Sequence, residues 1–273
     1  MKRVLILGGT SDARILATKA ALLSDLTVIT SLAGRTQNPA VSAGQVRVGQ
    51  VQIGQVQIGQ VRVGSFGGIQ GLVDYLQAER IDGLIDATHP FAAQISWHAA
   101  AAAEIVKIPH LMLVRPAWEK TPADRWIEVE SLQTAALTLP HLARRIFLTI
   151  GRQELAAFAH LSDLWFLMRM IEPPTAAIPP GLILLERGPF TEAHEQARLI
   201  EYEIEAIVSK NSGGDATDAK LKAARTVGIP VVMVQRPLLP EGEQVTTIDA
   251  ALRWIANRSG VANSDLTQGA AIS

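Results

Sequence analysis

The sequence predicts an α/β protein with two domains, each built on a mainly parallel sheet. Short apolar runs rich in valine, isoleucine and leucine alternate with segments of helical spacing along most of the chain. A polar stretch that contains a proline, residues 119–122, separates two such alternations, and 273 residues suffice for two domains. We therefore expect Rossmann-like domains over 1–120 and 121–257 with a cleft between them, then a disordered tail over 258–273.

Composition excludes several classes of partner and site. A net charge of -1 disfavours nucleic acid, because phosphate backbones select basic surfaces. The absence of cysteine excludes disulfides, thiolate nucleophiles and Cys-ligated metal, and we expect no metal site. The apolar run after Lys2 and Arg3 is too short for a secretion signal, and no apolar stretch is long enough to span a bilayer. We expect a cytoplasmic protein.

The first expected strand, residues 4–7, leads directly into Gly8, Gly9 and Thr10, after which helical spacing begins. Such a strand–glycine–helix unit presents backbone amides to the phosphates of a dinucleotide. The full G-x-G-x-x-G fingerprint is absent, and Asp12 in the first helical turn would repel a phosphate close to it. A nucleotide-binding turn and an ordinary tight turn both remain open.

The second expected strand, residues 26–30, is followed by Ser31 and Arg35 and by no carboxylate. Enzymes that use NAD often carry an acidic residue there for the ribose hydroxyls, whereas an arginine suits a 2′-phosphate. This pattern favours NADPH over NADH if the first glycine turn binds a dinucleotide. A solvated loop arginine is the alternative.

Residues 45–65 repeat a five-residue unit as Q-V-R-V-G, Q-V-Q-I-G, Q-V-Q-I-G and Q-V-R-V-G. In one continuous strand, an odd period would turn each copy to the opposite face. Three-residue strands joined by Gly-Gln turns would avoid this, although strands so short are marginal. We expect an insertion that is either loosely ordered or a small meander, and nothing in it indicates chemistry.

A further expected strand, residues 83–86, ends in Thr88, His89 and Pro90. Pro90 suits the first turn of a following helix, where its missing N–H costs nothing. Thr88 and His89 then lie at the carboxyl edge of the sheet, where open α/β folds bind ligands. His89 either donates a hydrogen bond or a proton there, or caps the helix.

In the second domain, an apolar run over 204–208 precedes a loop from Ser209 to Thr217 and a helix over 217–227. Gly213 and Gly214 allow a tight turn, and Asp215 or Thr217 is expected to cap the helix. With Lys210 and Lys220 at the two ends of the loop, this pattern predicts an anion site. The alternative is a solvated loop with two surface lysines.

Strand after strand ends in a cation. The five residues are Arg115, Arg152, Arg187, Lys210 and Arg236. If they cluster at the sheet edges, they form a positive cleft for a ligand with several carboxylates or phosphates. Alternatively, each cation pairs with a carboxylate of its own.

Several blocks of the sequence resemble the precorrin-6A reductase family. They include G-G-T at 8–10, S-L-A-G-R at 31–35, D-A-T-H-P-F at 86–91, G-R at 151–152, R-G-P-F at 187–190 and K-N-S-G-G at 210–214. The likeness runs in order from residue 4 to about residue 255. Two departures are Asp12, where a glutamate is more usual, and the repeat, which looks like a multiplication of one V-R-V-G stretch.

The resemblance implies an NADPH-dependent oxidoreductase of cobalamin biosynthesis. It would reduce one ring double bond of precorrin-6A, or of cobalt-precorrin-6A, to give precorrin-6B. The resemblance assigns the cofactor to Gly8, Gly9, Thr10, Ser31 and Arg35, with Thr88 and His89 at its nicotinamide end. It assigns the carboxylates of the tetrapyrrole substrate to Arg152, Arg187, Lys210, Asn211, Ser212, Gly213, Thr217 and Lys220. His89, Lys210 and bound water remain candidates for the proton donor.

Two other classes of function compete with this one. One is a non-catalytic nucleotide-binding or tetrapyrrole-binding protein, which turnover would distinguish. The other is a different two-domain nucleotide-dependent enzyme, such as a short-chain dehydrogenase or a sugar-nucleotide transferase. Short-chain dehydrogenases need Tyr-x-x-x-Lys, but Tyr75 and Tyr202 are followed four residues later by Glu79 and Ala206.

Overall fold

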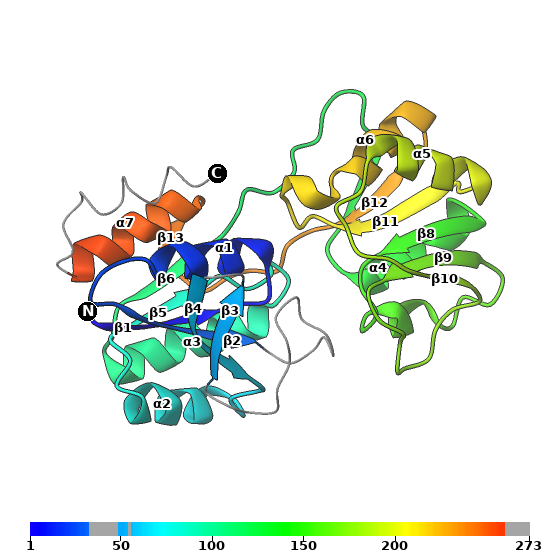
Figure 1. The fold of residues 1–273 in the computed structure, drawn as a ribbon. Helices are drawn as coiled ribbons and strands as arrows, with labels where there is room; N and C mark the ends of the chain where they lie inside the picture. Colours follow the sequence, from blue (N-terminus) through cyan, green and yellow to red (C-terminus); the bar gives the residue numbers. More distant parts are fainter. Residues whose placement is uncertain (33–48, 54–55, 260–273) are drawn as a thin grey trace. The chain divides into compact units, whose positions relative to one another are not determined.

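The chain forms two compact units. The computed structural model describes residues 1–32, 49–53 and 56–259. The first unit comprises Met1–Arg115 together with Leu238–Ser273, and the second comprises Pro116–Pro237 (Figure 1). The chain therefore leaves the first unit near the boundary expected at residue 120 and returns to it after Pro237.

Within the described residues, the sheet of the first unit has seven strands in the order β13-β6-β5-β1-β2-β4-β3. The strands are β1 (Arg3–Leu7), β2 (Thr27–Leu32), β3 (Gly49–Ile53), β4 (Val56–Val63), β5 (Gly83–Asp86), β6 (His110–Leu113) and β13 (Glu243–Val245). All neighbouring strands are parallel except β3, which is antiparallel to β4. The helices are α1 (Ser11–Ala20), α2 (Ile69–Ala78), α3 (Ala93–Val106) and α7 (Ile248–Ser259).

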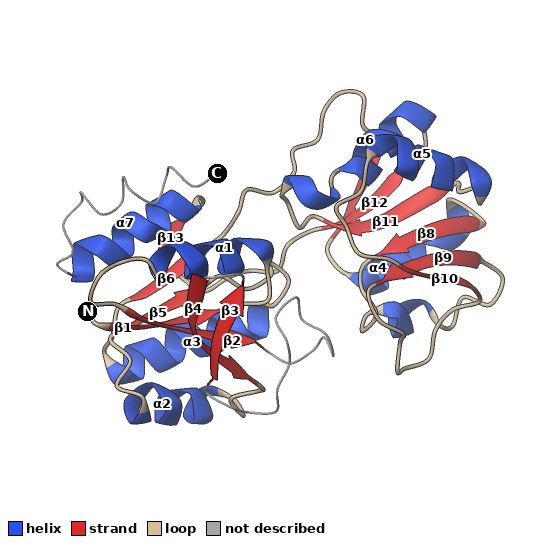
Figure 2. Ribbon diagram, viewed as in Figure 1, coloured by secondary structure: helices blue, strands red, loops and turns tan. Residues whose placement is uncertain are grey.

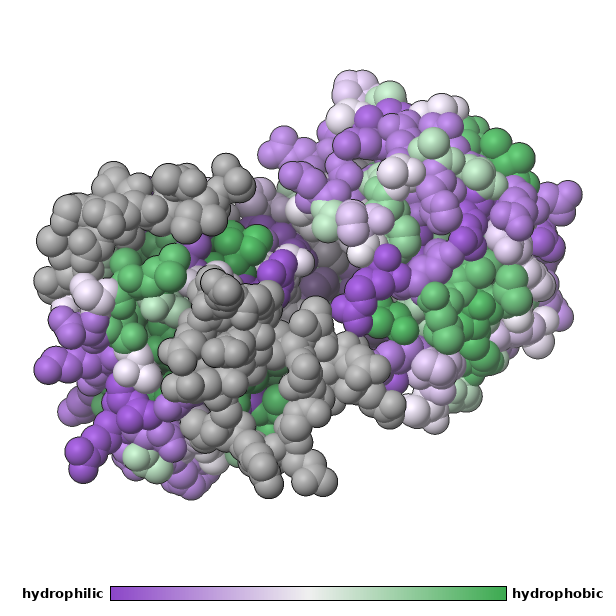
Figure 3. Space-filling model, viewed as in Figure 1, coloured by the Kyte–Doolittle hydropathy of each residue, from purple (hydrophilic) through white to green (hydrophobic). Residues whose placement is uncertain are grey.

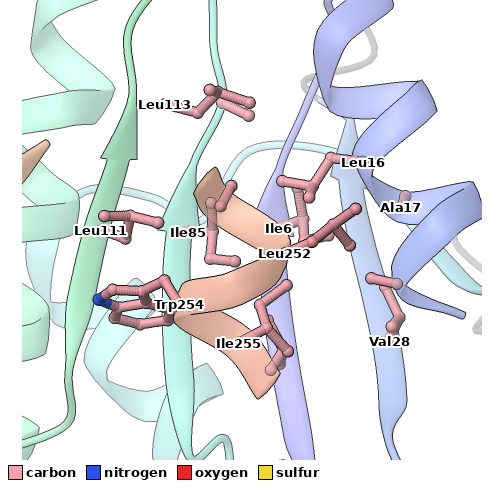
Figure 4. Close-up of a cluster of buried hydrophobic side chains, with 14 of the residues drawn as sticks. Ile6, Leu16, Ala17, Val28, Ile85, Leu111, Leu113, Leu252, Trp254 and Ile255 are labelled. Atoms are coloured by element: carbon pink, nitrogen blue, oxygen red, sulfur yellow. The ribbon is translucent and has the colours of Figure 1, made fainter. Parts of the chain in front are cut away.

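Helices cover both faces of this sheet, which explains why its inner strands are largely apolar. Ile6 packs with Leu16 of α1 and Ile255 of α7 on one face (Figure 4), while Leu5 packs with Leu72 of α2 on the other. Successive side chains of a strand point to opposite faces, so a strand covered on both sides needs no polar alternation.

The last strand and helix of the described chain belong to the first unit. Val245 of β13 pairs with Leu113 of β6, and Trp254 and Ile255 of α7 are buried in its core. We expected residues 121–257 to form the second domain, and this assignment is wrong from Leu238 onward. Helix α7 also continues to Ser259, two residues into the expected tail, and residues 260–273 lie outside the described ranges.

The repeat contributes β3 and β4 to the edge of this sheet. Gly59 and Gln60 lie inside the eight-residue strand β4, so the expected Gly-Gln turn is wrong at this copy. Gln50 pairs with Gln60 and Val51 pairs with Ile58, which leaves Gly59 as an extra residue on β4. One extra residue on one strand of an antiparallel pair is a β-bulge. Residues 54–55 lie outside the described ranges.

The sheet of the second unit has six parallel strands in the order β10-β9-β8-β11-β12-β7 (Figure 2). The strands are β7 (Trp126–Val129), β8 (Arg145–Thr149), β9 (Trp165–Met170), β10 (Gly181–Leu185), β11 (Ala206–Lys210) and β12 (Val231–Val234). The helices are α4 (Leu132–Thr138), α5 (Glu192–Glu201) and α6 (Ala219–Val227). None of the helices in the described ranges is long and apolar enough to cross a membrane.

One core cluster of the second unit lies between its sheet and helices α5 and α6. Phe147, Leu167 and Ile207 of the sheet pack with Leu199 of α5 and Leu221 of α6. Edge strand β10 is covered less completely. Leu182 and Leu185 are exposed, and Figure 3 shows apolar surface over β9 and β10.

Candidate functional site

The first candidate region is the turn between β1 and α1. Gly9 adopts a φ of 109°, a conformation that glycine tolerates best, and no atom lies within 4 Å of a Cβ added there. The Gly8 N–H donates to the Ser31 carbonyl, at 2.8 Å, which ties the turn to the end of β2. Thr10 caps α1 by accepting from the Ala13 N–H, at 3.0 Å. The turn therefore leaves open space over its backbone at a helix N-terminus, as a phosphate requires.

The charge of Asp12 in this turn is balanced within the same unit. Its carboxylate lies 3.4 Å from the guanidinium of Arg115, which follows β6. A phosphate at the glycine turn therefore meets an ion pair, and the repulsion expected from Asp12 is reduced. The same pairing removes Arg115 from the set of strand-end cations expected to face a ligand.

Thr88 and His89 follow β5 and line one small pocket. The pocket is bordered by Asp86, Thr88, His89, Pro90, Ser96, Met112, Leu113, Val114 and Leu239. Buried Asp86 accepts from both the Thr88 N–H, at 2.9 Å, and the Thr88 hydroxyl, at 2.6 Å. His89 Nδ1 accepts from the Phe91 N–H, at 3.2 Å, so the neutral ring carries its proton on Nε2. Pro90 precedes α3, which begins at Ala93, so its expected place in the first helical turn is wrong.

Ser31 and Arg62 lie side by side at the ends of β2 and β4. The two residues are partners in the parallel pairing, and Arg62 Nη1 donates to Ser31 Oγ at 3.4 Å. Arg62 was not among the expected site residues. The sequence signal that could have found it is the absence of any Asp or Glu between Asp25 and Asp74. Arg35 lies outside the described ranges, so its expected role stays a prediction.

The second candidate region is the loop that follows β11. Gly213 has a φ of 69°, and a Cβ there would lie 1.9 Å from the Pro116 carbonyl oxygen, so this close crossing requires glycine. Arg236 donates from Nε to the Asn211 carbonyl, at 2.8 Å, and from Nη2 to the Ser212 carbonyl, at 3.0 Å. Arg236 thus holds the backbone of the loop.

The start of the following helix differs from the expected one. Residues Asp215–Thr217 form a 3-10 turn, and α6 begins at Ala219. Its N-cap is Asp218, which makes no side-chain capping bond, so neither Asp215 nor Thr217 is the cap. The Thr217 carbonyl instead accepts from Lys220 Nζ, at 2.6 Å.

Two of the expected substrate-binding cations have carboxylate partners inside the second unit. Lys210 Nζ pairs with Glu154, and Arg152 lies 3.1 Å from Glu172. Arg187, which follows β10, also has a partner in the structure. The alternative in which each strand-end cation pairs with its own carboxylate therefore holds for Arg115, Arg152 and Lys210. A ligand carboxylate at Arg152 or Lys210 would have to replace a glutamate.

Lys220 is buried, so the alternative of a solvated surface lysine is wrong for this residue. Its side chain lies beneath the loop, with Nζ 4.6 Å from the centre of the Trp118 ring, and the residue is only 4% exposed. The pKa of Lys220 is lowered to about 7, mainly by burial and next by the Arg169 cation, while Glu195 and Asp218 raise it. A lysine of this kind exchanges a proton near neutral pH.

Arg169 and Glu195 form a buried ion pair next to Lys220. Arg169 lies in β9 with its guanidinium 3.8 Å from the Phe190 ring centre, and Glu195 of α5 is 0% exposed. Sequence analysis missed both residues, although an arginine inside the apolar strand W-F-L-M-R-M was a usable signal. A charge inside a strand needs a buried partner, which pattern alone does not identify.

Comparison with known proteins identifies the family. The family model described as "Precorrin-6x reductase CbiJ/CobK" matches residues 3–256. The chain belongs to this family. It is 47% identical over 257 residues to "Precorrin-6A reductase" of Rhodococcus erythropolis, covering 93% of this chain and 98% of the relative. It is 43% identical over 259 residues to "Precorrin-6A reductase" of Mycobacterium tuberculosis, covering 94% and 98%.

A solved structure of the same family has the same fold. The structure named "CobK precorrin-6A reductase" matches with a TM-score of 0.82 at 34% identity, over 96% of this chain and 99% of that one. The prediction of an α/β fold with mainly parallel sheets is thereby confirmed, as is the family resemblance. The chain is a reductase of the precorrin-6x family.

Proposed function

We propose that the protein reduces one ring double bond of precorrin-6A with NADPH, giving precorrin-6B in cobalamin biosynthesis. The observation that carries the proposal is membership of a reductase family across residues 3–256, with relatives matched over nearly their full length. The proposal accounts for both candidate regions, because a glycine turn suits a dinucleotide and basic loop residues suit a polycarboxylate.

The first unit is proposed to bind NADPH, which supplies the hydride. The open turn at Gly9 and the helix N-terminus behind it fit a dinucleotide phosphate. Thr10 makes the turn rigid, because its hydroxyl caps α1 and also donates to the Ala87 carbonyl, at 2.8 Å. Ser31 and Arg35 are proposed to meet the adenosine ribose, and Thr88 and His89 the nicotinamide end.

The second unit is proposed to bind the carboxylates of the tetrapyrrole. Lys210 and Arg152 each hold a glutamate that a substrate carboxylate replaces, so the cations stay compensated before and after binding. The loop backbone at Ser212 and Gly213 and the buried ammonium of Lys220 complete the proposed region. This exchange avoids the cost of keeping an unpaired cation partly buried.

Reduction also needs a proton beside the new C–H bond. Three donors fit the residues: the Nε2–H of His89, the ammonium of Lys210, and bound water. Lys210 Nζ is paired with Glu154. In a neutral His89 ring the proton is on Nε2, because Nδ1 accepts from the Phe91 N–H. The pH dependence of kcat in variants of His89 and Lys210 distinguishes the three: it changes in the variant that lacks the donor, and an unchanged profile in both variants assigns the proton to bound water.

The test is an anaerobic assay with purified protein, precorrin-6A and NADPH. We expect NADPH to be oxidised in step with the formation of a product that has gained two hydrogens by mass spectrometry. Omission of precorrin-6A is the control for uncoupled oxidation. If ligands bind and no NADPH is consumed, the protein is a binding protein and the reductase proposal fails.

A further inference from the structure

The end of the repeat carries a cation that the proposed reaction has not yet used. Arg62 is the arginine of the last V-R-V-G copy and lies at the carboxyl end of β4. Parallel strands β2 and β4 are neighbours, with Ser31 paired to Arg62, and the Gly8 N–H donates to the Ser31 carbonyl. The glycine turn, Ser31 and Arg62 are therefore consecutive across the sheet.

The guanidinium of Arg62 is held in place by uncharged groups. Nη1 donates to the Gly64 carbonyl, at 2.6 Å, and Nη2 to the Ser65 carbonyl, at 2.8 Å. The guanidinium carbon lies 3.8 Å from the centre of the Phe66 ring. The backbone of Phe66 packs tightly against Gly71, because a Cβ added at Gly71 would lie 1.8 Å from the Phe66 carbonyl oxygen.

Arg62 has N–H donors that make no hydrogen bond within the described residues, and no Asp or Glu lies near it in the sequence. A guanidinium has five N–H donors, and within the described part of the chain Nε–H and one Nη2 N–H make no hydrogen bond. From residue 26 to residue 73 the chain has three arginines and no Asp or Glu. The Arg62 side chain is half-buried, and this burial lowers the pKa of its guanidinium. A partly desolvated, rigid cation without a carboxylate is suited to an incoming anion.

We propose that Arg62 and Ser31 bind the 2′-phosphate of the cofactor's adenosine, and that Arg62 is a specificity-determining residue for NADPH. The inference rests on the proposed function, because it assigns a subsite of the same cofactor. A 2′-phosphate carries nearly two negative charges and three acceptor oxygens. The planar guanidinium and the Ser31 hydroxyl both donate to such a group. No carboxylate between residues 26 and 73 is present to accept from the 2′-hydroxyl of NADH.

The test uses adenosine fragments, so that it does not depend on turnover. Binding of 2′,5′-ADP and of 5′-AMP to the full-length protein is measured by calorimetry for wild type, Arg62→Gln and the matched control Arg253→Gln. Arg253 is an exposed residue of α7 in the same unit, so its loss changes the net charge equally. We expect Arg62→Gln to weaken the binding of 2′,5′-ADP at least ~10-fold and the binding of 5′-AMP less than ~2-fold. We expect Arg253→Gln to change neither affinity.

Arg62 also holds the turn after β4, so Arg62→Lys is included with a thermal melt of each variant. Lysine keeps the positive charge but lacks the planar guanidinium that donates two hydrogen bonds side by side. We therefore expect Arg62→Lys to have an affinity for 2′,5′-ADP between those of wild type and Arg62→Gln. Equal losses for the two fragments in Arg62→Gln and Arg62→Lys, or no loss for either fragment, overturn the inference. If the wild-type protein does not oxidise NADPH in the presence of precorrin-6A, the proposed function is overturned instead, whatever the affinities for the two fragments are.

Discussion

The side-chain amide of Asn211 pairs with the backbone of Trp118 as a peptide group would. The Trp118 N–H donates to Asn211 Oδ1, at 2.9 Å, and Asn211 Nδ2 donates to the Trp118 carbonyl, at 3.2 Å. The Trp118 indole N–H donates to the Gly214 carbonyl, at 3.0 Å, on the far side of the loop. Both ends of the Asn211 amide are thus engaged, which makes Asn211 a positioning residue for the loop. The expected direct contact of Asn211 with substrate stays a prediction.

Asn211→Ala should therefore destabilise the second unit. Two hydrogen bonds to a partly buried backbone are lost, at about 1–3 kcal/mol in total, because the Trp118 amide is left without a partner. Urea unfolding followed by tryptophan fluorescence measures the loss. Asn257→Ala, at an exposed position of α7, is the control and should unfold as the wild type does. An unchanged midpoint in Asn211→Ala would show that the pairing contributes nothing.

Arg169→Met should be among the most destabilising changes in the second unit. It leaves Glu195 fully buried without its ion-pair partner, and removal of one partner of a buried ion pair costs about 3–5 kcal/mol. The double variant Arg169→Met with Glu195→Leu should recover much of the loss, since no charge is then unpaired. Denaturant midpoints of the two single variants and the double variant form the cycle. If the losses simply add, the two residues are not coupled.

Lys220 should give the protein a pH-dependent stability on the alkaline side of neutrality. Its pKa is about 7 in the folded chain and 10.5 in the unfolded one, so between these values the unfolded state binds more protons. The free energy of unfolding should therefore rise with pH over this window, by up to about 1.4 kcal/mol per pH unit. Below the folded pKa Lys220 is protonated in both states, so the pH dependence from this residue is absent there.

Lys220→Met removes that dependence if the assignment is right. Melting temperatures of wild type and variant from pH 6 to about pH 9 should converge as pH rises, because the wild type sheds the buried charge. Lys222→Met, on the same helix with an exposed side chain, is the control and should follow the wild-type profile. Parallel profiles for Lys220→Met and wild type would contradict the low pKa of Lys220.

Lys210→Ala should affect the substrate and spare the cofactor. Loss of the ammonium that Glu154 holds removes one site for a substrate carboxylate, so we expect a higher KM for precorrin-6A or a lower kcat. A change of ~10-fold corresponds to one charge-assisted hydrogen bond. NADPH affinity, measured by fluorescence, should match that of wild type and of the control Lys222→Ala. Kinetics equal to wild type would assign Lys210 to a structural ion pair with Glu154.

The sequence alone determined the parts of this protein that depend on local chemistry. Short apolar runs predicted buried strands of mainly parallel sheets, and Gly8 and Gly9 after the first of them predicted a strand-to-helix turn, because burial and backbone freedom act within a few residues. The same local information predicted strands at 4–7, 26–30, 83–86 and 204–208, but it did not predict β7, α4 or β13.

Tertiary structure decided everything that joins distant segments. Residues 238–259 return to the first unit, Asn211 meets Trp118, and Lys220 is buried beside Arg169, although each pair is far apart in sequence. Charge patterns could not show that Lys210 and Arg152 hold glutamates, because a partner depends on which strands become neighbours. Sheet order is a property of the whole fold, and it is the reason that Ser31 and Arg62, 31 positions apart, lie together.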